Sequence, residues 1–288
     1  MDFLRPATWS EALAAKAAHP DAVPIAGGTD VMVELNFDRH RPPALLDLGR
    51  VDAITEWGTD GDLLRVGAGV TYRRILDELA DRLPGLALAA RTVGSPQIRN
   101  RGTVGGNLGS ASPAGDALPP LIAVDALVEL ASVRGVRRVP ATDFCTGPKR
   151  SVREPDELIA AFLVPAAGGP EQFAKVGTRN AMVIAVCSFA LALRPGSRRV
   201  GTGIGSAGPT PLRAREAEEF LAAELPWASR AALPAGVAGR FGELVAAAAS
   251  PIDDVRGSAA YRRHALGVLA RRTLDWAWTE HRDGNGGA

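Results

Sequence analysis

Hydrophobic and polar positions in the first fifty residues change repeatedly between a helical and a strand-like pattern. The opening segment carries helix start signals, with Thr8 or Ser10 as N-cap. An apolar run then ends in Gly27 and Gly28, which is typical of a strand that feeds a tight turn. The pattern predicts a helix over residues 8–19, a strand over 22–26, a short helix over 31–35 and a buried strand over 43–48. This order predicts a small α/β unit.

The middle of the chain contains one long segment without periodicity. Residues 93–116 are rich in Gly, Ser, Asn and Pro and have apolar elements on both sides. We expect an irregular stretch placed in this way to be functional rather than disordered. The flanking pattern predicts a strand over 63–71, a helix over 72–83, a helix and then strands over 118–165, further strands over 173–196, and alanine-rich helices over 215–225, 241–250 and 258–278.

Composition narrows the functional class. The chain has 288 residues, of which 46% are hydrophobic and 23% are charged, as in an ordinary globular protein of two or three compact units. The net charge of +1 gives no overall field that would recruit nucleic acid or an anionic membrane. The sequence has no run of 18 apolar residues and no signal-peptide core at its start. We therefore expect no membrane span and a cytoplasmic location.

Two cysteines are too few for a metal centre within this chain. Cys145 and Cys187 form no CxxC pair, whereas an iron–sulfur cluster or a structural zinc needs about four ligands. We expect both to behave as small buried hydrophobic residues. The four histidines are scattered and are expected to have surface or packing roles: His19, His40, His264 and His281. No bound metal and no catalytic residue are predicted.

The glycines point to a bound nucleotide. The chain has 32 glycines, more than the usual share of about 7%, and they cluster in two segments. In residues 24–30 (PIAGGTD), a strand leads to adjacent glycines and then to a hydroxyl residue. Bare backbone N–H groups at such a place can hold a phosphate without a cation. The segment is neither GxGxxG nor a P-loop, so a plain strand–helix turn remains an alternative.

The second glycine segment runs from residue 99 to residue 116 (RNRGTVGGNLGSASPAGD). Adjacent glycines again permit close backbone approach, and the neutral polar side chains offer hydrogen bonds. Asp116 closes the segment and is suited to anchor a hydroxyl-rich or N–H-bearing part of a ligand. An Ω-loop held by its own side chains is the alternative. Two such segments in one chain favour a shared ligand with a diphosphate.

At residues 26–30 (AGGTD) and 97–116 (QIRNRGTVGGNLGSASPAGD), the chain closely resembles the FAD subunit of carbon monoxide dehydrogenase-type enzymes and the FAD domain of xanthine dehydrogenase and aldehyde oxidase. The resemblance covers essentially the whole chain. It implies an α+β fold, with a two-subdomain FAD-binding domain of the vanillyl-alcohol oxidase and p-cresol methylhydroxylase type and a smaller α+β C-terminal domain. We place the subdomains at residues 1–57 and 58–168, the C-terminal domain at 169–280, after a linker at 166–172, and a disordered tail at 281–288.

The resemblance also implies which residues bind FAD. The first loop comprises Ile25, Ala26, Gly27, Gly28, Thr29 and Asp30; the second comprises Thr103, Gly106, Asn107, Ser110, Gly115 and Asp116; and Val93, Gly94, Ile159 and Lys175 lie nearby. Ile159 as plain core and Lys175 as a solvated strand end are the alternatives for these two positions. Arg99 and Arg101 are interpreted as structural or partner-facing residues.

By the same resemblance, the chain relays electrons within a heterotrimeric molybdenum hydroxylase and has no activity on substrate alone. Its partners are a small ferredoxin-like subunit with [2Fe–2S] clusters and a large subunit with a molybdopterin-type cofactor, as a dimer of heterotrimers. The sequence does not identify the final electron acceptor, which can be a quinone, NAD or oxygen, since no nicotinamide-binding fingerprint is present.

Two other functions remain open at this stage. A stand-alone FAD-dependent oxidase or dehydrogenase should show catalytic side chains over the flavin, and the two tyrosines, Tyr72 and Tyr261, lie outside the glycine segments. A nucleotide-binding or assembly protein without a redox role would lack a flavin spectrum.

Overall fold

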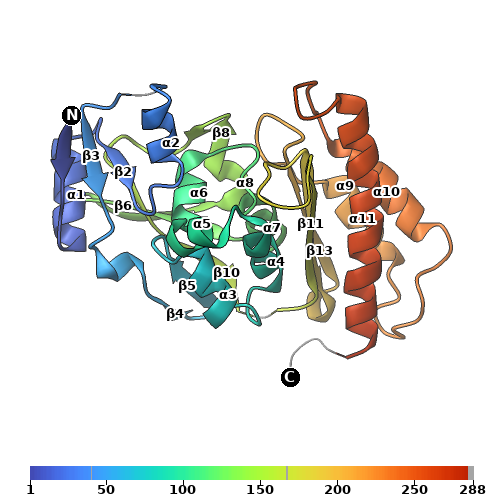
Figure 1. Cartoon of the computed structure of the whole chain (residues 1–288). Helices are drawn as coiled ribbons and strands as arrows, with labels where there is room; N and C mark the ends of the chain where they lie inside the picture. The colour runs from blue at the N-terminus through green and yellow to red at the C-terminus, as the bar shows by residue number, and fades with distance from the viewer. Residues whose placement is uncertain (40, 167, 285–288) are drawn as a thin grey trace.

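The computed structural model describes residues 1–39, 41–166 and 168–284 and contains three main sheets that follow one another along the molecule (Figure 1). The N-terminal lobe lies at one end, a larger central sheet lies in the middle, and the C-terminal sheet with its long helices lies at the other end. The predicted α+β class is confirmed. None of the helices in these ranges combines the length and the apolar composition that a membrane span needs.

The N-terminal lobe is a small parallel sheet in the order β1–β3–β2, with α1 packed on it through Ala12 and its neighbours. The helix predicted at residues 8–19 is confirmed. Thr8 is its N-cap and accepts a hydrogen bond from the Glu11 amide at 3.2 Å, while the Glu11 carboxylate bonds back to the Thr8 amide. The elements are β1 (Asp2–Leu4), α1 (Trp9–Ala18), β2 (Val23–Ile25), α2 (Val31–Asn36) and β3 (Ala44–Asp47).

The central sheet is antiparallel, in the order β4–β5–β10–β6–β7, and its helices bury the largest apolar core of the molecule. Its strands are β4 (Trp57–Asp60), β5 (Leu63–Gly67), β6 (Leu127–Ser132), β7 (Gly135–Pro140) and β10 (Leu158–Pro165), preceded by the short η1 (Asp52–Ile54). Its helices are α3 (Tyr72–Glu78), α4 (Pro84–Thr92), α5 (Pro96–Arg101), α6 (Val104–Ser110), α7 (Leu118–Ala123) and α8 (Ala141–Phe144), with a hairpin of β8 (Cys145–Gly147) and β9 (Arg150–Ser151).

The C-terminal part is an antiparallel sheet covered by three helices. Its strand β12 is buried on both faces: Phe189 and Leu191 belong to the core under the helices, whereas Ala190 belongs to the core of the central part. The apolar run predicted as strand is therefore sandwiched between the two cores. The elements are β11 (Glu171–Val176), β12 (Cys187–Arg194), η2 (Pro195–Ser197), β13 (Arg199–Gly205), α9 (Arg215–Glu224), α10 (Val237–Ala248) and α11 (Ala259–Arg282).

The prediction of an irregular segment at residues 93–116 is wrong, because this segment contains α5 and α6. Ser95 and Thr103 cap them, accepting hydrogen bonds from the amides three residues later. Both helices are too short for an apolar stripe, so periodicity did not reveal them.

Two further boundaries differ from the sequence-based prediction. The helix predicted at residues 72–83 ends at Glu78, and a second helix, α4, begins at Pro84, since proline disfavours a helical conformation in the residue before it and suits a first helical position. Helix α11 extends through Arg282, two residues into the segment predicted as a disordered tail. Residues 283–284 of that segment form a turn, and residues 285–288 lie outside the described residues.

Glycines on β13 allow the C-terminal sheet to pack directly against α7. A Cβ atom at Gly203 would lie 2.0 Å from the Pro119 carbonyl oxygen, and one at Gly201 would lie 1.9 Å from the Ala123 carbonyl oxygen. Both distances are far shorter than van der Waals contact, so only glycine fits there without a backbone shift.

We expect Gly203→Ala to lower the free energy of unfolding by about 1–3 kcal/mol, the usual cost of overpacking. The control is Gly58→Ala, in strand β4, where a Cβ atom meets nothing within 4 Å. Chemical denaturation of both variants would measure the difference. Equal stability of the two would contradict the close packing of β13 on α7.

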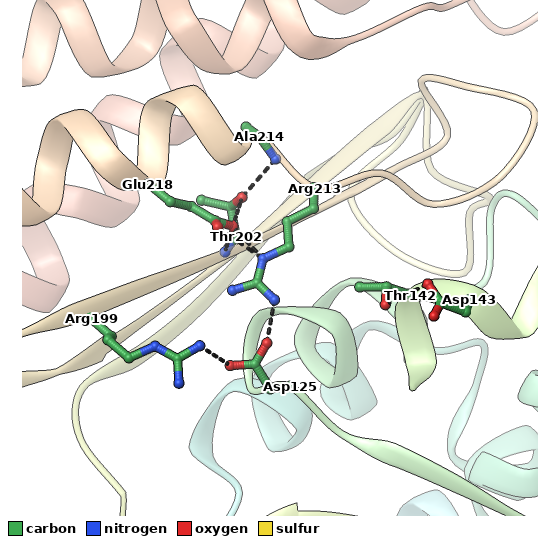
Figure 2. A network of polar contacts seen from close by, with 8 residues as sticks. All are labelled: Asp125, Thr142, Asp143, Arg199, Thr202, Arg213, Ala214 and Glu218. Carbon is green, nitrogen blue, oxygen red and sulfur yellow. Dashed lines mark hydrogen bonds and ion pairs between the residues drawn. The ribbon is translucent and has the colours of Figure 1, made fainter. Parts of the chain in front are cut away.

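A polar network reinforces this contact, as Figure 2 shows. Asp125, which follows α7, forms ion pairs with Arg213 and with Arg199, the latter at 3.1 Å. Arg213 also pairs with Glu218 of α9 at 2.7 Å, and Glu218 accepts a hydrogen bond from the Thr202 hydroxyl of β13 at 2.7 Å. The central and C-terminal parts are therefore joined by both backbone packing and charge pairs.

Candidate functional site

The first glycine segment is a tight turn between β2 and α2. Gly28 has a φ of +76°, in the left-handed region that side chains disfavour. A Cβ atom at Gly27 would lie 1.8 Å from the carbonyl oxygen of Arg101. The first glycine segment thus packs backbone against backbone on the second, although the two are far apart in the sequence.

The second segment is fixed on the chain that leaves β5. The Tyr72 amide donates a hydrogen bond to the Gly102 carbonyl at 3.0 Å, and the Gly105 amide donates to the Ala68 carbonyl at 3.1 Å. A Cβ atom at Gly105 would lie 2.4 Å from that of Ala68. Gly105 is therefore required by packing within the protein.

Gly106 differs from Gly105 because the position of its Cβ atom faces outward. It is exposed, and a Cβ atom there would meet only the Thr103 hydroxyl, at 3.0 Å. This hydroxyl is already engaged, since it accepts a hydrogen bond from the Gly106 amide at 2.9 Å. The packing of the chain does not explain this glycine, whereas close approach of a ligand to the backbone does.

The polar side chains after Gly106 hold the end of the segment together. The Asn107 side-chain oxygen accepts a hydrogen bond from the Ala117 amide at 3.3 Å and lies 2.8 Å from the position of a Cβ atom at Gly115. Ser110 donates to the Asn107 carbonyl at 2.9 Å. Asn107 and Ser110 therefore stabilise the conformation of the second glycine segment through their side chains.

Asp116 and Lys175 form a buried ion pair between the central and C-terminal parts. Lys175 on β11 places its ammonium 2.6 Å from Asp116 Oδ2 and also donates to the carbonyls of Thr92 and Val183, at 3.0 and 3.2 Å. The two side chains are 8% and 10% exposed, which excludes the alternative that Lys175 is a solvated strand end. Burial raises the pKa of Asp116 above its ordinary value, and the Lys175 ammonium opposes this rise.

The remaining predicted residues border the same region. Val93 and Gly94 follow α4, directly after Thr92, and both carbonyls accept hydrogen bonds from Arg99, at 3.1 and 3.0 Å. This supports the interpretation of Arg99 as a structural residue. Ile159 is 7% exposed in the central core, and its Cδ1 lies 3.6 Å from the position of a Cβ atom at Gly109.

Two unpartnered buried atoms belong to this region. Within the part of the chain that the structure describes, neither Asp116 Oδ1 nor the Tyr72 hydroxyl has a hydrogen-bond partner. Tyr72 lies outside both glycine segments in the sequence, and only folding brings it to the second segment. Buried polar atoms without partners are rare in proteins, and a bound ligand would satisfy them. These atoms and the open side of Gly106 fit a polar ligand such as a dinucleotide.

The cysteines do not add chemistry to the site. Burial raises the pKa of Cys187 to about 12 and that of Cys145 to about 11, so both thiols stay protonated. Among the described residues, no group of three or more His, Cys, Asp or Glu side chains is arranged to hold a metal ion.

Comparison with known proteins agrees with this geometry. The family model "FAD binding domain in molybdopterin dehydrogenase" matches residues 1–167, and "CO dehydrogenase flavoprotein C-terminal domain" matches residues 172–277. The chain is 32% identical to the xanthine dehydrogenase FAD-binding subunit of Escherichia coli O157:H7, over 96% of this chain and 95% of that protein. It is 30% identical to the carbon monoxide dehydrogenase medium chain of Afipia carboxidovorans, over 96% of both.

A solved structure has the same fold over its full length. Quinoline 2-oxidoreductase from Pseudomonas putida 86 superposes with a TM-score of 0.88 and 26% identity, covering 98% of both chains. Both relatives named above are a subunit or chain of a larger dehydrogenase. These matches support the predicted subunit role over a stand-alone flavin oxidase.

Proposed function

Because this chain belongs to the family of FAD-binding subunits of molybdopterin-containing dehydrogenases, we propose that its two glycine segments together hold the diphosphate of FAD. The observation that carries this proposal is the backbone contact between Gly27 and Arg101, with the open side of Gly106 in the same segment. Backbone amides free of side chains approach a diphosphate closely, and they need no cation to do so.

The proposed FAD site takes its residues from all three parts of the chain. The first segment supplies Ile25 to Asp30, and the second supplies Thr103, Gly106, Asn107, Ser110, Gly115 and Asp116, with Val93, Gly94, Ile159 and Lys175 completing the site. We assign residues 1–57 and 58–168 to the two FAD-binding subdomains and residues 169–280 to the C-terminal domain. The buried Lys175 ammonium, paired with Asp116, is the contribution of the C-terminal domain to the site.

In the working complex, we propose that the chain serves as an electron relay. Bound FAD supplies chemistry that exchanges electrons singly or in pairs, and the protein places and tunes it. The proposed partners are a small subunit with [2Fe–2S] clusters and a large subunit with a molybdopterin-type cofactor, as a dimer of heterotrimers in the cytoplasm. Substrate chemistry then belongs to the large subunit, while this chain's residues bind and orient the flavin.

A spectrum and an activity assay test this proposal on the purified chain. We expect FAD-loaded protein to absorb at about 450 nm and to oxidise no aldehyde, purine or carbon monoxide by itself. When the partner subunits are added, we expect substrate to bleach this band. Turnover by the chain alone would refute the relay role, and failure to retain FAD would refute the site.

A further inference from the structure

Tyr72 packs against Gly102 of the second glycine segment, close to where this segment meets the first. It is the first residue of α3 and is 3% exposed. A Cβ atom at Gly102 would lie 3.4 Å from Tyr72 Cδ2 and 3.5 Å from the Thr29 hydroxyl. The Tyr72 ring is therefore in contact with the residue that also borders the first segment.

The position of the Tyr72 hydroxyl is not explained by packing. Phenylalanine would fill the same apolar space without burying a polar atom, and the hydroxyl finds no partner among the described residues. Asp116 Oδ1 is the second orphaned atom of the region, and it can only accept a hydrogen bond. One unpaired donor and one unpaired acceptor thus remain in the proposed FAD site.

Charge around Tyr72 keeps its hydroxyl a donor. Burial raises the pKa of Tyr72 well above its ordinary value, and the carboxylates of Asp116 and Asp30 raise it further. Asp30 belongs to the first glycine segment and Asp116 to the second. The phenol therefore stays protonated, and its proton can be donated.

We propose that Tyr72 is a cofactor-positioning residue whose hydroxyl donates a hydrogen bond to a sugar hydroxyl of bound FAD, on the ribityl chain or the ribose. A sugar hydroxyl can accept from Tyr72 and donate to Asp116 Oδ1, whereas a phosphate oxygen or a flavin carbonyl can only accept. This inference rests on the proposed function and adds a residue to it that lies outside both glycine segments.

The Tyr72→Phe variant tests this role by affinity and by stability. We expect the Kd for FAD to rise about tenfold, the loss of one hydrogen bond, while the FAD-free protein melts at the same temperature or higher because an unpaired hydroxyl is removed. The control is Tyr261→Phe, since Tyr261 is 48% exposed on α11 and should leave both measurements unchanged. A Tyr72→Phe variant that is less stable without FAD but binds it normally would show a structural role and overturn the proposal.

FAD analogues that each lack one sugar hydroxyl identify the partner. Titrating wild type and Tyr72→Phe with each analogue gives a double-mutant cycle. We expect one analogue to bind the two proteins equally, because its missing hydroxyl and the missing phenol remove the same hydrogen bond. If the Kd values of the wild type and Tyr72→Phe differ by the full factor for every analogue, the partner of the hydroxyl is water or phosphate and the proposal is wrong. Absence of FAD binding by the wild type would instead refute the proposed function itself.

Discussion

We expect the Gly106→Val variant to fold and to lose at least about 100-fold in affinity for FAD, because a side chain there would occupy the approach of the ligand to the backbone. Within the protein, the added Cβ atom meets only the Thr103 hydroxyl, at 3.0 Å. The effect on folding should stay near the value of one helix cap, about 1 kcal/mol. Visible absorption of the FAD-loaded protein and a thermal melt of the FAD-free protein would measure the two effects separately.

Two other glycines of the same helix provide matched controls. At Gly109, a Cβ atom would make an ordinary contact of 3.6 Å with Ile159, so Gly109→Ala should keep both the fold and FAD. At Gly105, it would lie 2.4 Å from the Ala68 Cβ, so Gly105→Ala should lower stability. Full retention of flavin by Gly106→Val would contradict the assignment of the second segment to the cofactor.

The Lys175→Met variant should lose about 3–5 kcal/mol of unfolding free energy near neutral pH, the usual effect of removing one partner from a buried ion pair. Its ammonium lies 2.6 Å from Asp116, and both side chains are at most 10% exposed. Methionine has a similar length and an apolar tip, so the space stays filled while Asp116 becomes a buried, uncompensated carboxylate.

The loss in Lys175→Met should depend on pH in a defined direction. Burial already raises the pKa of Asp116, and removing the opposing ammonium raises it further. A carboxyl group whose pKa is higher in the folded than in the unfolded protein stabilises the fold at pH below the unfolded pKa, and this stabilisation is lost as pH rises through the folded pKa. The loss of unfolding free energy relative to the wild type should therefore be largest at pH values above the raised pKa of Asp116. It should shrink as the pH falls toward about 3.9, the ordinary pKa of an aspartate.

Urea denaturation of Lys175→Met at about pH 5 and about pH 8 would test this dependence. The double variant with Asp116→Asn provides the control, because an uncharged amide of the same size removes the unpaired carboxylate. We expect the double variant to recover much of the stability and to lose the pH dependence. A deficit that is equal at both pH values would show that Asp116 stays charged in the variant and would contradict this account.

Much of the fold was predictable from the sequence because its signals are local. The Thr8 capping signal predicted α1, and the apolar run at residues 43–48 predicted β3. The adjacent glycines at residues 27–28 and 105–106 predicted that backbone would approach a ligand closely. The order of sheet and helices beyond residue 169 also followed from periodicity, which each segment carries within itself.

Other features of the site could not be predicted, since they depend on residues that only folding brings together. Helices α5 and α6 are held by caps and by hydrogen bonds to the chain that follows β5 rather than by an apolar stripe, so periodicity missed them. Sequence could not say that Gly105 serves packing while Gly106 stays open, although the two are adjacent.

The sequence by itself determined the α+β class, the order of most elements and the two glycine segments that mark the family. Tertiary structure alone decided that Gly27 packs on Arg101, that Lys175 pairs with Asp116 from 59 residues away, and that Tyr72 packs against Gly102. Turn, cap and periodicity signals arise between neighbours in the chain. Pairings of buried charges and orphaned hydroxyls arise between elements, and packing of the whole chain sets their geometry.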